Sequence, residues 1–237
     1  MPHNHILSSF DDELSRLRSK IVKMGTRVEQ QYKNAAISLK NKDCKLADKV
    51  RQSDKIIDQM DMEIEKLAIE MIALRSPMAD DLRDIVSTIK ISAGLERIGD
   101  YSKNLAKRVS VLSDKENITV SSALIGQMVI QIRAMITDVI DAYINRDIEK
   151  AIDVWRRDQE VDNLYNSLFR EMLTYMMENP QNITLATHLL FIAKNIERAG
   201  DHATNIAELV YYINEGELLA LKRPKNDSSN YAEIDGK

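Results

Sequence analysis

The chain has 237 residues, of which 44% are hydrophobic and 30% are charged, and it contains only 7 Gly and 4 Pro. This mixture is typical of amphipathic helices packed around a core, and so few turn-forming residues leave little room for strand turns. A formal net charge of −4 without a contiguous Lys/Arg-rich block lacks the usual electrostatic signature of nucleic-acid binding, so we expect no direct nucleic acid partner.

The composition also indicates a protein of the reducing cytoplasm. The single Cys44 cannot form an internal disulfide, and residues 1–9 lack the basic and apolar regions of a signal peptide. No stretch approaches the roughly 18 consecutive apolar residues that are needed to span a bilayer. We therefore expect a cytoplasmic localisation, with peripheral membrane association through partners or through the protein surface.

Three long helices are predicted in the first half of the chain. Apolar residues keep a three- and four-residue spacing from Leu14 to Leu39, which predicts a long amphipathic helix. Asp43 can cap the N-terminus of the next helix, and Pro77 breaks the chain before a third. We place these helices near 8–40, 44–75 and 79–112.

The second half of the chain repeats the first. Four features recur at offsets that shrink from 104 to 101 residues, namely Asn41-Lys42-Asp43 as Asn145-Arg146-Asp147, Asp54/Asp58 as Asp158/Asp162, Pro77 as Pro180, and Glu96-Arg-Ile-Gly-Asp100 as Glu197-Arg-Ala-Gly-Asp201. A regular internal period indicates duplicated structural units. The corresponding helices are expected near 120–144, 148–178 and 183–214. The predicted fold class is all-α, with two pseudo-symmetric three-helix bundles at 8–112 and 120–214 and a flexible tail at 222–237.

Pairs of carboxylates are the residues most able to carry chemistry. Two acids four residues apart share one face of a helix, and each half has such a pair on its second and on its third helix. Carboxylates from two adjacent helices can surround a hard cation such as Mg²⁺, Mn²⁺, Ca²⁺ or iron. The candidate metal ligands are Asp54, Asp58, Glu96, Asp100, Asp158, Asp162, Glu197 and Asp201. Gly99 and Gly200, inside the third-helix motifs, indicate a close helix approach.

A second interpretation of these acids is a solvated helix face. Arg97, Arg198, Lys103 and Lys107 are close enough in sequence to pair with them, as most such charges do. The recurrence of the pairs at matching places in both halves favours a metal site. The sequence contains neither a P-loop nor a GxGxxG phosphate cradle, and no nucleophile stands out, so we expect no enzymatic activity.

Five segments resemble the PhoU family, and the resemblance runs from about residue 8 to 215; they are Gly25-Thr-Arg-Val-Glu-Gln-Gln31, Asp54-Lys-Ile-Ile-Asp58, Leu95-Glu-Arg-Ile-Gly-Asp100, Leu173-Thr-Tyr-Met-Met-Glu178 and Ile196-Glu-Arg-Ala-Gly-Asp201. The resemblance implies two three-helix bundles with acidic metal motifs, whose ligands fall on the eight carboxylates named above. It also implies a homodimeric cytosolic regulator that acts between the phosphate-specific ABC transporter and a membrane sensor histidine kinase and keeps the phosphate-starvation response off.

Two other classes of function were weighed. A carboxylate-bridged di-iron enzyme is disfavoured because such helical bundles typically carry Glu-x-x-His pairs, which this sequence lacks. A structural helical dimer or scaffold without a functional metal is the alternative that stays open, and a metal analysis of the purified protein would separate it from a metal-binding regulator.

Overall fold

The computed structural model describes residues 3–112 and 121–219. Within these ranges the chain forms six α-helices and one 3-10 turn and contains no strand, which confirms the all-α fold class. In chain order the elements are α1 (His3–Asn41), α2 (Cys44–Arg75), α3 (Ala79–Leu112), α4 (Ser121–Asn145), α5 (Ile148–Glu178), η1 (Pro180–Asn182) and α6 (Ile183–Glu215).

The helix ends follow local signals in the sequence. Asp43 accepts a hydrogen bond from the backbone N–H of Leu46 at 3.0 Å, and Asp147 accepts one from Lys150 at 2.9 Å, so both predicted N-caps are confirmed. Breaks beside the two predicted prolines are also present. The helix bounds lie close to those expected, although α1 begins earlier, at His3. The expected tail at 222–237 lies outside the described residues.

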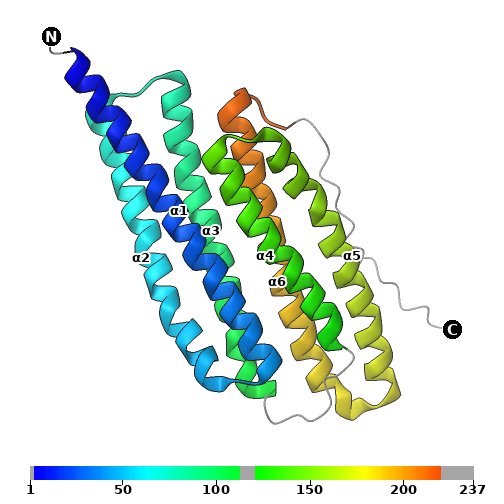
Figure 1. Ribbon diagram of the computed structural model, residues 1–237. Helices are drawn as coiled ribbons and strands as arrows, with labels where there is room; N and C mark the ends of the chain where they lie inside the picture. Colours follow the sequence, from blue (N-terminus) through cyan, green and yellow to red (C-terminus); the bar gives the residue numbers. More distant parts are fainter. Residues whose placement is uncertain (1–2, 113–120, 220–237) are drawn as a thin grey trace.

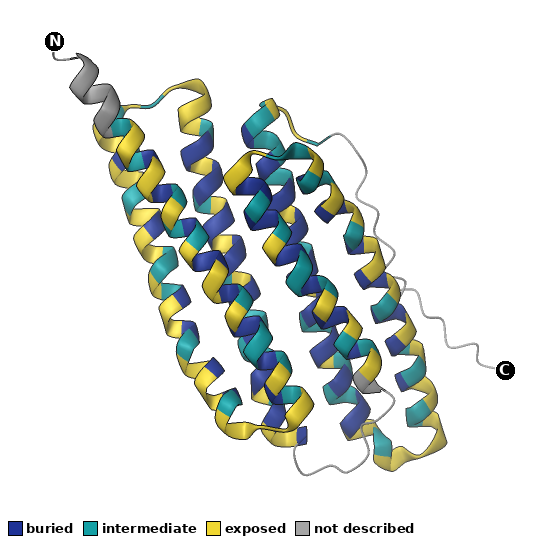
Figure 2. Ribbon diagram, viewed as in Figure 1, coloured by how far each residue is buried: buried dark blue, intermediate teal, exposed yellow. Residues whose placement is uncertain are grey.

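The helices form two groups of three that lie side by side (Figure 1). Helices α1, α2 and α3 pack against one another, and so do α4, α5 and α6. The two groups meet where α1 packs against α4 and α3 packs against α6. The central helices α3 and α6 carry more buried residues than the outer helices α2 and α5 (Figure 2).

A pseudo-two-fold axis relates the two groups. In a two-fold interface, residues at the axis contact their own equivalents. The guanidinium of Arg133 donates to Glu29 at 2.6 Å, and these residues are 104 apart, which is the offset between α1 and α4. The rings of Tyr101 and His202 lie 5.7 Å apart, and these residues are separated by the 101-residue offset of α3 and α6. Both pairs therefore lie near the axis, which supports the predicted pseudo-symmetry.

Glycines allow the two groups to approach closely. A Cβ atom on Gly25 of α1 would lie 2.7 Å from Cγ1 of Ile140 on α4. A Cβ atom on Gly94 of α3 would lie 3.1 Å from Cγ1 of Ile206 on α6. Any larger residue at these positions must displace the isoleucine, because interiors are packed to nearly crystalline density.

A buried carboxylate links three helices at the same interface. Asp84 of α3 has a side chain that is only 6% exposed, and it accepts hydrogen bonds from Arg18 of α1 and from Arg146, which follows α4. The Arg146 contact is 2.6 Å long. Two partly exposed guanidiniums satisfy the buried charge, so this contact ties the first group of helices to the second.

Helix α4 is rich in apolar residues. Among the described helices, it alone has the length and composition to cross a membrane, over Ala123–Asn145, with a mean hydropathy of 1.4. The segment includes Arg133, Asp138 and Asp141, so the expectation that the chain has no run of about 18 consecutive apolar residues holds. The high mean hydropathy fits the position of α4, which packs against α1, α5 and α6. A core helix of a bundle meets the same criterion.

We predict that Gly25→Leu lowers the free energy of unfolding by about 1–3 kcal/mol, because the new side chain overpacks the contact with Ile140. The matched control is Gly126→Leu, since no atom lies within 4 Å of a Cβ placed on Gly126. That change should be neutral or raise stability by up to about 1 kcal/mol through helix propensity. Urea unfolding of both variants checks the prediction, and equal stability of the two would contradict it.

Candidate functional site

The candidate site of the first half is built around Asp54, which α2 carries into the interior with its side chain 3% exposed. The side-chain amide of Gln31 on α1 donates to Asp54 Oδ1 at 3.0 Å and to the backbone carbonyl of Gly99 at 3.2 Å. The ammonium of Lys103 on α3 donates to Asp54 Oδ2 and, at 2.6 Å, to Asp100 Oδ1. All three helices of the half therefore contribute to the satisfaction of this buried charge.

A glycine on the third helix lies close to the second helix in both halves. A Cβ atom on Gly99 would lie 3.7 Å from Asp54 Oδ1 and 3.1 Å from the Ile57 side chain. A Cβ atom on Gly200 would lie only 3.1 Å from Asp158 Oδ1. The predicted close helix approach is confirmed at both positions.

The other first-half acids form one electrostatic cluster with Asp54. Burial raises the pKa of the Asp58 carboxyl, and the neighbouring Asp54 charge raises it further. Burial likewise raises the pKa of Glu96, and Asp100 adds to the effect. The guanidinium of Arg97 lies 3.6 Å from both Glu96 and Asp100, which partly offsets the repulsion. The structure thus brings the four predicted acids of this half together.

Lys103 is the cation of the first-half cluster. Burial alone would lower its pKa, but hydrogen bonds to Asp100 and Asp54 outweigh burial, so the pKa lies above its usual value and the ammonium is retained. The Lys103 ammonium therefore lies between Asp54 and Asp100 and supplies the positive charge that a metal ion would otherwise have to supply.

The second-half acids are more deeply buried than those of the first half. Asp158 and Asp162 on α5 are each 1% exposed, Glu197 on α6 is 3% exposed, and Asp201 is half-buried. One oxygen of Glu197, Oε1, accepts a hydrogen bond from the Lys194 ammonium at 3.1 Å. The other oxygen, Oε2, is buried without a hydrogen-bond partner. Burial, followed by the Asp201 charge, raises the pKa of Glu197 to about 7 against the effect of Lys194.

The residues that donate hydrogen bonds to the acids of the first half are replaced in the second half. At the offset of 101, Lys103 corresponds to Thr204, whose hydroxyl donates to the Gly200 carbonyl at 2.9 Å. At the offset of 104, Gln31 corresponds to Met135, which has no amide to donate. The two clusters therefore share their acids but differ in the groups that neutralise them.

The donor chemistry of a metal site differs between the halves. As the side chains stand, no three His, Cys, Asp or Glu residues in the described ranges are arranged to hold a metal ion. In the first half Lys103 already bridges Asp54 and Asp100, so the residues do not fit an additional cation there. In the second half the buried Glu197 Oε2 without a partner, among hard oxygen donors, fits one. The eight predicted ligands remain a prediction.

Sequence reasoning missed two functional residues of the first-half cluster. Lys103 was considered only as a surface partner of the acids, whereas it reaches the buried Asp54 from α3. Gln31 lies at a seam position of α1, and a polar residue at such a position is the signal that could have identified it.

A duplicated six-helix bundle with a cluster of carboxylates in each half, at least one of them buried, defines the class of protein. The model of the PhoU domain family matches the chain twice, at residues 21–109 and 125–210. The chain therefore belongs to the PhoU family.

Similar proteins cover almost the whole chain. A relative from Caulobacter vibrioides is 44% identical over 94% of this chain and 97% of its own length, and one from Rhizobium meliloti is 46% identical over 97% of both. Both are named phosphate-specific transport system accessory protein PhoU homolog. The crystal structure of PhoU from Pseudomonas aeruginosa is 36% identical, covers 88% of this chain and all of its own, and superposes with a TM-score of 0.85. The phosphate transport system regulatory protein PhoU from Streptococcus pneumoniae is 29% identical over 90% of this chain and all of its own, with a TM-score of 0.83.

We predict that Glu197 makes the metal-free protein less stable as pH rises. Its pKa is raised from 4.5 to about 7 in the folded state, so its stabilising contribution is complete below about pH 4.5 and is lost as pH rises through 7. Glu197→Gln should therefore lose less stability than the wild type between about pH 5 and about pH 8. Urea unfolding at both pH values measures this, with the exposed Glu178→Gln as control. Parallel pH profiles for all three proteins would contradict the assignment.

Proposed function

We propose that the protein is an accessory regulator of the phosphate-specific transport system. The observation that carries this proposal is the near full-length similarity to relatives that bear that name, at 44–46% identity. In this proposal the protein acts in the cytoplasm as a non-enzymatic adaptor between the phosphate ABC transporter and a sensor histidine kinase. Its long helical faces offer the docking area that such a role requires, and its effect on transcription is indirect.

We further infer that carboxylates in the second half bind a hard cation, with Mg²⁺, Mn²⁺, Ca²⁺ or iron as the candidates. The support is the buried Glu197 Oε2 and the raised pKa of the same group, because a bound cation would satisfy that oxygen and favour the charged carboxylate. In the first half Lys103 supplies the positive charge, so metal binding there is weaker unless Lys103 moves.

The runner-up is a helical scaffold or structural homodimer without a functional metal. The ion pairs that Lys103 makes with Asp54 and Asp100, and the Lys194–Glu197 pair, favour this alternative, because they neutralise acids without any ion. Homodimerisation remains a proposal that is compatible with both functions, and the mass of the protein in solution at high concentration tests it.

For the regulatory role, we predict that deletion of the gene leaves phosphate-starvation genes active in phosphate-rich medium, because the inhibitory link from the transporter to the kinase is lost. Reporter activity of a phosphate-starvation promoter measures this, and reintroduction of the wild-type gene is the control. A pull-down from membranes that contain the transporter tests the physical link. Normal repression in the deletion strain would count against the proposed function.

For the metal, we predict that Mn²⁺ or Mg²⁺ raises the melting temperature of the wild type and that Glu197→Gln with Asp201→Asn abolishes most of this shift. A ligand that binds only the native state stabilises it by RT ln(1 + [L]/Kd), about 2.7 kcal/mol at a hundred times Kd. The amides keep the side-chain shape but lose both charges.

Reciprocal variants sharpen the metal experiment. Lys103→Thr removes the internal cation of the first half and should add a metal-dependent shift, whereas Thr204→Lys should reduce the shift of the second half. Bound metal per chain, measured on the dialysed protein, is the second readout. An unchanged melting temperature of the wild type with every metal tested would favour the scaffold without a metal.

A further inference from the structure

Helix α1 carries an excess of positive charge that the net charge of the whole chain conceals. Between Leu14 and Lys42 there are eight Lys and Arg residues and a single carboxylate, Glu29. That carboxylate is paired with Arg133 of α4. Six of the basic residues lie at exposed or half-exposed positions of α1, and we call them the α1 ridge: Arg16, Lys20, Lys23, Arg27, Lys33 and Lys40.

Most charges of the α1 ridge are not neutralised by the protein. Within the part of the chain that the structure describes, Lys20 is the only member with an ion pair, at 2.7 Å from Glu63 of α2. The exposed carboxylates Asp11 and Asp12 lie only at the N-terminal end of the ridge. The sequence has no contiguous Lys/Arg-rich block, but these side chains make this face of α1 basic.

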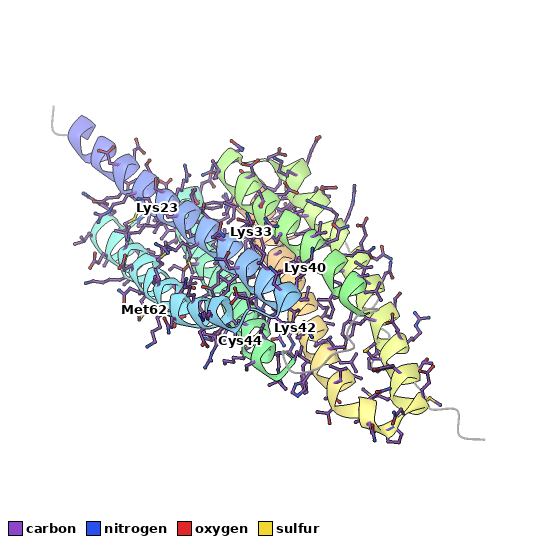
Figure 3. The ribbon with its side chains drawn as sticks, turned by 60° about the horizontal axis from the view of Figure 1, so that its bottom comes forward. Lys23, Lys33, Lys40, Lys42, Cys44 and Met62 are labelled. Carbon is purple, nitrogen blue, oxygen red and sulfur yellow. The ribbon has the colours of Figure 1, made fainter. Side chains whose placement is uncertain are left out.

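The first four residues of the α1 ridge form a straight row, and Lys33 and Lys40 lie more than roughly 100° round the helix from that row. Arg16, Lys20, Lys23 and Arg27 follow one another at intervals of four, three and four residues, so they lie on one side of the helix over a length of about 16 Å. Figure 3 shows Lys23, Lys33 and Lys40 along α1, with Lys42 continuing past its end. This arrangement suits a flat anionic surface better than a single small anion.

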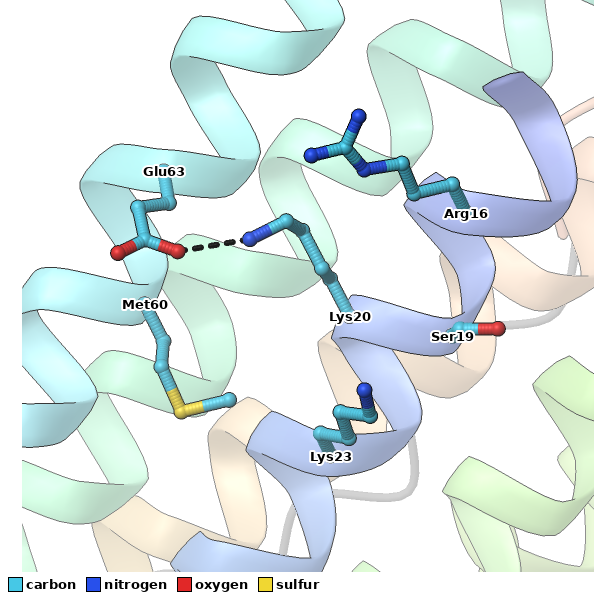
Figure 4. A pocket seen from close by; sticks show the side chains of 6 residues that line it. All are labelled: Arg16, Ser19, Lys20, Lys23, Met60 and Glu63. Carbon is cyan, nitrogen blue, oxygen red and sulfur yellow. Dashed lines mark hydrogen bonds and ion pairs between the residues drawn. The ribbon is translucent and has the colours of Figure 1, made fainter. Parts of the chain in front are cut away.

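A hollow between α1 and α2 interrupts the ridge near its N-terminal end. It has a volume of about 360 Å³ and is lined by Arg16, Ser19, Lys20, Lys23, Met60 and Glu63. Figure 4 shows the basic side chains on the α1 side and Met60 and Glu63 on the α2 side. Three cations and one hydroxyl can donate to phosphate oxygens here, while the Met60 side chain provides an apolar wall.

The fold itself does not require the α1 ridge. At the offset of 104, Lys23 corresponds to Gln127 and Arg27 corresponds to Gln131 on α4. The equivalent groove between α4 and α5 is lined by these glutamines together with Glu160. Two halves with the same helix packing thus differ in the charge of this surface, so the basic residues are not explained by folding.

Exposed apolar side chains accompany the charges. Ile37 lies on α1 itself and is 38% exposed, and Ile56 and Met62 on the adjacent α2 are 43% and 55% exposed. A mixture of Lys/Arg and large apolar residues is typical of surfaces that lie on a lipid headgroup layer, whereas binding to nucleic-acid phosphates gains nothing from the apolar residues.

We propose that the α1 ridge docks this protein directly on an anionic lipid bilayer, with lipid phosphates contacting Arg16, Lys23 and Arg27 and the apolar side chains at the headgroup level. Attraction falls off within a Debye length, so the whole helix must approach the surface. This contact would hold the protein at the membrane in the absence of any protein partner. It is independent of the proposed transport role, because the test uses lipid alone.

The experiment is co-sedimentation of the full chain with vesicles of one part phosphatidylglycerol to two parts phosphatidylcholine, compared with phosphatidylcholine alone. The variant is Arg16→Gln with Lys23→Gln and Arg27→Gln, which spares the Lys20–Glu63 pair. The matched control removes three exposed cations from other helices, through Lys90→Gln, Arg156→Gln and Arg170→Gln. Circular dichroism checks that each variant is folded.

We expect the wild type to bind the anionic vesicles, and the ridge variant to bind them about a hundredfold more weakly, since each Lys or Arg near an anionic surface contributes roughly a factor of five. The control should change affinity far less, and added salt should weaken wild-type binding. Three outcomes would overturn the proposal: no binding of the wild type to anionic vesicles, equal loss in both variants, or retention on duplex DNA but not on vesicles at the same salt concentration.

Discussion

The burial of carboxylates on the second helix of each half, Asp54 in the first and Asp158 and Asp162 in the second, is the constraint on which the rest of the structure depends. A charge in a protein interior is strongly unfavourable unless hydrogen bonds and an opposite charge satisfy it. Asp54 meets this condition through Gln31 and Lys103, which come from the two other helices of its half. The third helix packs closely against the second there, because a Cβ atom on Gly99 would lie 3.1 Å from the Ile57 side chain. The same helix, α3, also packs against α6. Its position therefore determines both the carboxylate site and the contact between the two halves.

The two halves satisfy this constraint in different ways. In the first half a lysine carried by the chain supplies the positive charge, so that the cluster is complete without a ligand. In the second half Thr204 occupies the corresponding position and turns its hydroxyl to the backbone, while one oxygen of Glu197 stays buried without a hydrogen-bond partner. The two halves therefore keep the same acids but neutralise them differently, and the replacement of Lys103 by Thr204 accounts for much of that contrast.

The sequence predicted those features that depend on local chemistry or on strict periodicity. The caps at Asp43 and Asp147, the breaks at Pro77 and Pro180 and the helical spacing of apolar residues act within a few residues, so they were accessible without a structure. The role of Lys103 was not, because its reach to Asp54 depends on how two helices are placed against each other.

The α1 ridge was hidden for another reason. Its residues are separated by polar and apolar positions, so no contiguous basic block is present, and acids elsewhere reverse the sign of the total charge. The charge becomes visible only when residues three and four apart are placed on one side of a helix. The net charge therefore describes the chain as a whole but not the local charge of this surface. Helix α4 is the opposite case. Its mean hydropathy is that of a membrane span, but the helix packs against three neighbouring helices of the bundle.

The Arg133–Glu29 contact at the pseudo-two-fold axis has a consequence for how the halves recognise each other. Two copies of the first half in the same arrangement would bring glutamate against glutamate, and two copies of the second half would bring arginine against arginine. Like charges at such short range repel, whereas the observed pair attracts. This contact therefore favours pairing of the first half with the second half over pairing of either half with a copy of itself.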